Sequence, residues 1–235
     1  MVRIAHLADI HLRLNQRHDE YRQVFRRLFK QLKEQKPDRI VLAGDIVHSK
    51  ITMSPELISI MTFFINGLRR IAPVDILPGN HDLNLSNKDR MDALSPVINV
   101  LKTSKGNLHP VNYYTKTGLH EVPDTNIVYA AWSMMDGKDL VIKDKDPDKI
   151  YIGLFHGAVR GSLMDNNYHL SDADASVSMF DQCDIVLLGD IHRRQGFGPC
   201  DEVTIEEIVT EDELKRLQDQ SNISDMQILE QLEDG

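Results

Sequence analysis

The sequence predicts an α/β fold of two mixed β-sheets flanked by helices, and two observations carry this prediction. In the first half of the chain, short apolar runs alternate with longer segments of helical periodicity, as strands and helices do in α/β proteins. A series of shorter runs separated by turn residues then follows, and these predict a second sheet. The runs expected as strands are residues 4–8, 40–43, 74–77, 150–155 and 185–188.

Three segments are expected to be helices. Residues 19–35 carry apolar side chains at helical spacing, and the opposite face is basic. We favour a solvated surface for that face, with contact to phosphate groups as the alternative. Ser54-Pro55-Glu56 begins a second helix, because proline suits the first helical position. Residues 90–101 are the third. The runs 108–114, 118–122 and 126–131 are expected as antiparallel strands of the second sheet.

Charge divides the chain into two parts. Residues 201–235 contain 12 Asp and Glu against Lys215 and Arg216, which is a net charge of −10, so residues 1–200 carry +1 of the total of −9. A nearly neutral body permits nucleic acid binding but does not argue for it. We expect one domain over residues 1–195, followed by an acidic, helical tail over 196–235 to which no role is assigned.

Composition also bears on compartment. No apolar run approaches the roughly 18 residues that a membrane span needs. Cys183 and Cys200 have neither metal-ligand spacing nor a disulfide-rich pattern. The first residues lead directly into a strand, so no signal peptide is expected. These features predict a cytoplasmic protein without membrane contact.

Polar side chains with metal-binding chemistry follow all five strand-like runs. Each motif alone is weak, because Asn and Asp are common in turns. Together they are strong, because ligands gather at the carboxyl ends of strands in α/β sheets. Oxygen and imidazole ligands without Cys suit Mn²⁺, Mg²⁺ or Fe²⁺ and allow Zn²⁺. The motifs, in order, are Asp9-x-His11, Gly44-Asp45, Gly79-Asn80-His81-Asp82, His156-Gly157 and Gly189-Asp190-x-His192.

This series closely resembles the calcineurin-like metallophosphoesterases, and among them the Mre11/SbcD-type DNA nucleases, including phage members. The resemblance covers about residues 1–195 and implies the four-layer metallophosphoesterase sandwich. It stops after Gln195, where the resembled nucleases continue into a small capping domain that helps to hold DNA. We therefore expect this chain to lack the usual capping domain.

The resemblance implies a role for each polar residue at the strand ends. His81 is catalytic and protonates the leaving oxygen, and we expect Asp82 to orient it. His48, Arg193 and Arg194 are expected to bind substrate. Two divalent cations are implied, with Mn²⁺ favoured and Mg²⁺ as the alternative. The implied ligands are Asp9, His11 and His192 for the first metal, Asp45 as the bridge, and Asn80, His156 and Asp190 for the second.

Asp190 departs from the resembled pattern, because many of those nucleases have His at this position. With Asp9 and Asp45 it gives three anionic ligands, so the charge of a site with two divalent cations falls from about +2 to about +1 and harder metals are favoured. The alternative is that Asp190 turns away from the site. We favour ligation.

The expected function is dinuclear-metal hydrolysis of phosphodiesters. The resemblance implies a DNA exonuclease or endonuclease subunit in repair or recombination, with DNA and an SbcC/Rad50-type ATPase as partners. A homodimer is also expected, and the host cytoplasm if the chain is phage-encoded. The alternatives are a phosphodiesterase or phosphatase acting on a small substrate, and a scaffold that keeps the fold without turnover.

Overall fold

The computed structural model describes residues 2–14, 17–51, 53–87, 89–104, 106, 108–163, 168–191 and 195. The chain divides into two compact units, Met1–Pro199 and Cys200–Gly235. The second unit and the expected tail helices lie outside the described residues. All elements below belong to the first unit.

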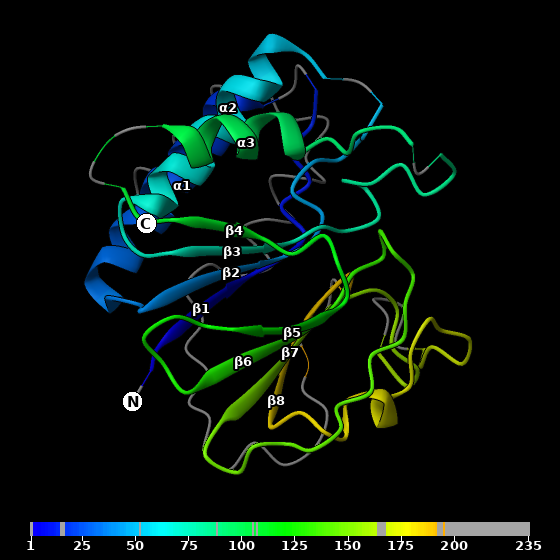
Figure 1. Ribbon diagram of the computed structural model, residues 1–235. Helices are drawn as coiled ribbons and strands as arrows, with labels where there is room; N and C mark the ends of the chain where they lie inside the picture. The colour runs from blue at the N-terminus through cyan, green and yellow to red at the C-terminus, as the bar shows by residue number, and fades with distance from the viewer. Residues whose placement is uncertain are drawn as a thin grey trace. The chain divides into compact units, whose positions relative to one another are not determined.

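Two four-stranded sheets form the framework (Figure 1). The first has the order β1-β2-β3-β4 and all its strands are parallel. Its strands are β1 (Ile4–Leu7), β2 (Arg39–Ala43), β3 (Val74–Leu77) and β4 (Val111–Tyr113). The second has the order β5-β6-β7-β8. Its strands are β5 (Gly118–Glu121), β6 (Ile127–Trp132), β7 (Ile150–His156) and β8 (Ile185–Gly189).

Three helices cover the face of the first sheet that points away from the second: α1 (His18–Gln35), α2 (Pro55–Arg69) and α3 (Ser95–Thr103) (Figure 1). The start of α2 is the one predicted, because the Ser54 hydroxyl accepts a hydrogen bond from the Leu57 N–H (3.2 Å) and Pro55 follows it. No helix in the described residues is both long and apolar enough to cross a membrane.

The third helix begins later than the expected residue 90. The Asp92 carboxylate accepts hydrogen bonds from the N–H groups of Leu94 (2.9 Å) and Ser95 (2.8 Å). These bonds hold a turn before the helix and satisfy N–H groups at its start, and Pro96 follows in the first helical turn. Asp92 therefore sets where α3 begins.

Strand pairing corrects one expectation. Of the run 108–114, expected in the second sheet, residues 111–113 form β4, which pairs in parallel with β3 of the first sheet. Among the described strands, only β5 is antiparallel to its neighbour, and β6, β7 and β8 pair in parallel. The cause is the crossover through α3, which returns the chain for parallel pairing. The predicted α/β fold with two sheets flanked by helices is confirmed, although only the second sheet is mixed among the described strands.

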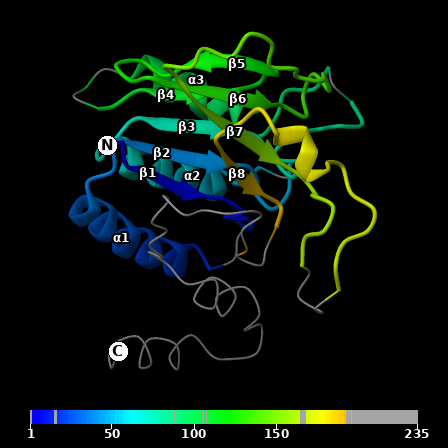
Figure 2. The ribbon, with the colours of Figure 1, turned by 90° about the horizontal axis from the view of Figure 1, so that it is seen from below.

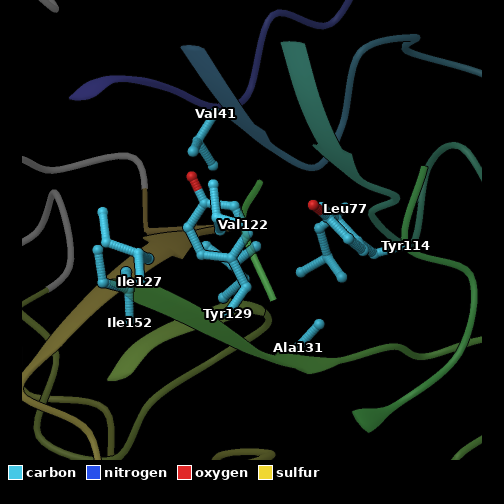
Figure 3. Packing of buried hydrophobic residues seen from close by; sticks show 9 residues of the cluster. Val41, Leu77, Tyr114, Val122, Ile127, Tyr129, Ala131 and Ile152 are labelled. Carbon is cyan, nitrogen blue, oxygen red and sulfur yellow. The ribbon is translucent and has the colours of Figure 1, made fainter. Parts of the chain in front are cut away.

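One apolar core lies between the two sheets. Val41 on β2 and Leu77 on β3 meet side chains of the second sheet (Figure 3). Within the described part of the chain, the outer face of the second sheet is covered by segments 133–149, 157–163 and 168–176 and by the 3₁₀-helix η1 (Val177–Phe180). Trp132 packs there against Phe180, with ring centroids 5.3 Å apart.

A buried carboxylate also joins the two sheets. Asp75 on β3 accepts two hydrogen bonds from Arg39 (2.8 and 2.6 Å) and one from Asn112 (2.8 Å). The hydroxyls of Tyr114 (3.0 Å) and Tyr129 (3.2 Å) also donate to it, and Tyr129 lies on β6 of the second sheet. Burial and the Asp75 charge raise the pKa of both phenols, so both remain protonated donors.

Two substitutions should separate the charge pair from the rest of this network. Asp75→Ala leaves the Arg39 guanidinium buried without its counter-ion and should lower the free energy of unfolding by about 3–5 kcal/mol. Tyr129→Phe removes one hydrogen bond to an anion that keeps other donors and should cost less, about 1.5–3 kcal/mol. Urea unfolding followed by circular dichroism measures both, and equal losses would contradict the central role of the ion pair.

Candidate metal centre

The first two strand ends lie side by side. The segments that follow β1 and β2 stay paired, because the N–H of Asp9 donates to Gly44 O (3.2 Å) and the N–H of His11 donates to Asp45 O (2.9 Å). The parallel pair therefore places Asp9 and His11 next to Asp45. The strands β1, β2 and β7 point toward the same side of the molecule (Figure 2).

Left-handed backbone marks these positions. Eight non-glycine residues have positive φ in the described part of the chain, and four of them are Asp9 (55°), His11 (48°), Asp45 (51°) and Asp190 (72°). This conformation is uncommon for residues with a Cβ and costs energy, so it persists where surrounding contacts enforce it. Its concentration at strand ends with metal-binding side chains indicates a functional site.

His156 brings the second sheet into the site. Its Nδ1 donates to Ala43 O (2.8 Å) at the end of β2, which leaves Nε2 of the neutral ring as the available ligand atom. That Nε2 lies 3.1 Å from Asn80 Oδ1 and 3.3 Å from Asp45 Oδ1. Asp190 follows Gly189, the pairing partner of His156, and its Oδ1 is 3.9 Å from the same Nε2.

Three glycines make room for this ring. A Cβ on Gly44 would lie 2.1 Å from His156 Nδ1, and one on Gly189 would lie 2.4 Å from the same atom. A Cβ on Gly79 would lie 2.2 Å from Asp45 Oδ1 and 2.7 Å from His156 Nε2. The glycines that precede Asp45, Asn80 and Asp190 in the motifs are therefore required by the close packing of the site.

The side chains form two overlapping ligand groups. Asp9, His11 and Asp45 make one, and Asp45, His156 and Asp190 make the other; within each group the ligand atoms lie within 4.8 Å of one another. Asp45 belongs to both, as a bridging ligand must. Three carboxylates in so small a volume repel one another unless cations neutralise them. The donor set therefore fits divalent metal ions.

The pKa values of the central pair reflect its burial and its contacts. Burial disfavours the charge on both groups, but their mutual interaction outweighs it. The pKa of Asp45 is consequently lowered, and the pKa of His156 is raised to about 9. Asp45 is thus an anion at neutral pH, and His156 must release a proton before it can bind a metal.

His81 lies beside the two ligand groups that share Asp45 and is a member of neither. Its backbone N–H donates to Asp45 Oδ1 (2.9 Å), and its Nε2 lies 3.9 Å from Asp45 Oδ2. Its Nδ1 donates to His48 O (2.7 Å), and the two rings are stacked with centroids 5.6 Å apart. The structure thus brings His48 and His81 to the site, whereas His192, Arg193 and Arg194 lie outside the described residues.

The expected orientation of His81 by Asp82 is wrong. The Asp82 carboxylate is buried and accepts hydrogen bonds from the backbone N–H groups of Ile46 (3.3 Å), Val47 (3.0 Å) and Gly79 (3.0 Å). Burial raises its pKa to about 7. Because backbone donors take up this side chain, Asp82 holds the two strand-end loops together, and the His48 carbonyl orients His81 in its place.

Some supporting residues escaped the sequence analysis. The Tyr21 hydroxyl donates to His11 O (3.0 Å), so a core residue of α1 also fixes a ligand backbone. Lys50 donates to Asn80 O (3.1 Å). Gln195 accepts from the N–H of Leu163 (2.7 Å) and donates to Leu163 O (3.0 Å), which ties the loop after β7 to the segment after β8. Only the position of Gln195 beside the last motif hinted at a role.

The family to which this chain belongs is consistent with a metal site at these residues. The calcineurin-like phosphoesterase family model matches residues 2–194, and the chain belongs to that family. It is 43% identical over 205 residues to uncharacterized protein R555 of Acanthamoeba polyphaga mimivirus. The match covers 82% of this chain and 15% of that relative, so the chain spans only a small part of its length.

A solved structure, the Pseudomonas putida nuclease MPE, is 12% identical with a TM-score of 0.35 over 72% of this chain and 67% of the other, a likeness too low to inform the assignment. The family binds divalent metals, and the two ligand groups that share Asp45 are where this chain would hold them.

Metal affinity should depend on pH through His156. Since its pKa in the metal-free protein is about 9, a metal must displace a proton at lower pH. Affinity for Mn²⁺ should therefore rise with pH between 6 and 8, by up to about tenfold per unit from this one proton. Calorimetric titration of the metal-free chain at several pH values measures the slope. His156→Asn should flatten it by about one proton, and an unchanged slope would contradict the assignment.

Substitutions at Asp190 test whether its carboxylate is a ligand. Asp190→Ala should weaken one of the two metals markedly, whereas Asp190→His should restore that metal and shift preference toward Zn²⁺. Metal content by mass spectrometry provides the readout. Asp172→Ala, an exposed carboxylate on the loop after β7, is the matched control. Unchanged metal content in Asp190→Ala would contradict ligation.

Proposed function

We propose that this chain is a dinuclear-metal phosphodiester hydrolase that cleaves DNA, as an exonuclease or endonuclease subunit in repair or recombination. Membership of the calcineurin-like phosphoesterase family supports metal-dependent phosphoester hydrolysis as the class of chemistry. The observation that carries the proposal is the placement of His81 beside two ligand groups that share Asp45.

The ligands divide between two metal positions. Asp9 and His11, with His192 from the sequence pattern, would hold the first, and Asn80, His156 and Asp190 the second, with Asp45 between them. Two bound divalent cations would supply an activated water and neutralise charge on the phosphate oxygens. The buried Asp45 and the packing around His156 keep the ligand atoms in place without a substrate.

His81 would transfer the proton. Its Nδ1–H is committed to the His48 carbonyl, so Nε2 is the atom that exchanges a proton with substrate. The side chain is 38% exposed, and a phosphodiester entering from solvent can reach it. In its protonated form Nε2 would donate to the leaving oxygen.

Exposed apolar side chains support a substrate larger than a simple phosphate. Ile51, Met91 and Tyr168 are 67%, 69% and 73% exposed on the loops that follow β2, β3 and β7. Nucleic-acid bases stack on aromatic side chains such as Tyr168 in sequence-independent binding, and Ile51 and Met91 add apolar contact surface. The loops that carry ligands would thus also contact the bases or sugars of a nucleotide, which favours a nucleic acid over a small phosphomonoester.

The partners and location rest on the resemblance to Mre11/SbcD-type nucleases. We propose an SbcC/Rad50-type ATPase and a second copy of the chain as partners, action without a membrane, and the cytoplasm of a host cell as the place of action. A small-substrate phosphodiesterase or phosphatase remains the alternative enzyme, and a non-catalytic scaffold is the alternative from another class. Hydrolysis assays separate the three.

The test uses Mn²⁺ with linear double-stranded DNA and, separately, with bis-p-nitrophenyl phosphate. A nuclease cleaves DNA and loses activity with EDTA, a small-substrate enzyme hydrolyses only the nitrophenyl ester, and a scaffold hydrolyses neither. His81→Asn should lower the rate about 10²–10⁴-fold, the usual worth of general acid catalysis, while both metals stay bound.

His109→Asn is the control for this substitution, because His109 is exposed and lies before β4, at the end of the first sheet opposite the site. Metal content and rate are measured on the same preparations. Loss of Mn²⁺ from the Mn²⁺-loaded His81→Asn protein would make His81 a ligand of the dinuclear site and overturn its assignment as the proton donor.

A further inference from the structure

We propose that His11, His48 and His81 form a second, alternative metal site that selects Zn²⁺ and inhibits the enzyme when filled. Zinc binding here is independent of the proposed nuclease function, whereas the inhibition rests on it. This site differs from the two carboxylate-containing groups because all three ligands are imidazoles.

The spacing of the rings fits one tetrahedral ion. The ring centroids are 4.9 Å apart for His11 and His81, 5.7 Å for His11 and His48, and 5.6 Å for His48 and His81. A Zn–N distance of about 2.0–2.1 Å places the centroids of tetrahedrally arranged imidazoles about 5 Å apart. The three rings thus already have nearly the separation of a His₃ zinc site.

Closure onto an ion requires only side-chain movement. One ligand nitrogen from each ring lies within 4.8 Å of the others, whereas about 3.3 Å separates nitrogens around tetrahedral Zn²⁺. The backbones are fixed, because His48 N–H donates to Leu12 O (2.9 Å), His11 O accepts from Tyr21, and His81 N–H donates to Asp45. The His48 carbonyl takes Nδ1–H of His81, which leaves Nε2 as its ligand atom.

The new site and the first carboxylate group exclude each other, because both use His11. A neutral imidazole has one free lone pair and so binds one metal at a time. Hard ions such as Mn²⁺ and Mg²⁺ favour the Asp9–His11–Asp45 group, whereas imidazole ligands suit Zn²⁺. The identity of the metal would therefore decide which triad His11 joins.

Occupancy by Zn²⁺ would remove two functions together. It draws His11 from the first metal position and engages the lone pair of His81 that proton transfer needs. A chain loaded with Mn²⁺ should consequently lose activity when Zn²⁺ is added, even though Zn²⁺ is an accepted metal in many hydrolases.

The test is titration of the metal-free full chain with Zn²⁺ and with Mn²⁺, in wild type, His48→Ala and the control His109→Ala. His48→Ala keeps the backbone carbonyl that orients His81, so it removes only the imidazole ligand. Zn²⁺ affinity should fall about tenfold or more, while Mn²⁺ affinity stays within about twofold and His109→Ala changes neither.

A second variant guards against indirect effects. His48→Cys supplies a thiolate, which is a good zinc ligand, and should regain Zn²⁺ affinity without altering that for Mn²⁺. Equal Zn²⁺ affinity in wild type and His48→Ala overturns the proposal, as does failure of His48→Cys to differ from His48→Ala. A selective loss of Zn²⁺ binding in a protein without nuclease activity would support the site and refute the proposed function alone.

Inhibition is measured on the Mn²⁺-loaded protein, with each variant compared with its own rate without Zn²⁺. His48→Ala should need about tenfold more Zn²⁺ for half-inhibition than wild type. The same Zn²⁺ sensitivity in both would refute the inhibitory role of this triad.

Discussion

The Asp45 carboxylate is the group on which the rest of the site depends. Its side chain is 1% exposed, and a buried charge is stable only when neighbours compensate it. One oxygen accepts the N–H of His81 and faces His156, while the other lies 3.7 Å from His11 Nε2. Segments from three strand ends of the first sheet and one of the second therefore converge on a single anion.

The packing of the two sheets therefore determines the geometry of the site. His156 belongs to the second sheet but donates to Ala43 O of the first, and Gly44 and Gly189 leave the space that its ring occupies. Farther along the strands, Asp75 joins the sheets through Arg39 and Tyr129. An apolar core packs the two sheets together, and these polar contacts fix the position of one sheet against the other.

The site also combines two kinds of metal ligand, carboxylates and imidazoles. Carboxylates and an amide gather around His156, whereas three imidazoles gather on the side of His48 and His81. His11 lies at the boundary between them. Because hard and borderline metals differ in their preference for oxygen and nitrogen, the same pocket can respond differently to Mn²⁺ and Zn²⁺.

By itself the sequence determined the class of fold and the identity of the residues at the strand ends. Apolar runs followed by Asp, Asn or His suffice for that, since parallel strands deliver their carboxyl ends to one edge. Tertiary structure alone decided that β4 joins the first sheet and that Asp92 delays α3. It also decided that the Asp82 carboxylate accepts from backbone N–H groups and that the His81 ring donates to the His48 carbonyl. A polar side chain forms hydrogen bonds with partners that are near in space, and the sequence does not show which residues those are.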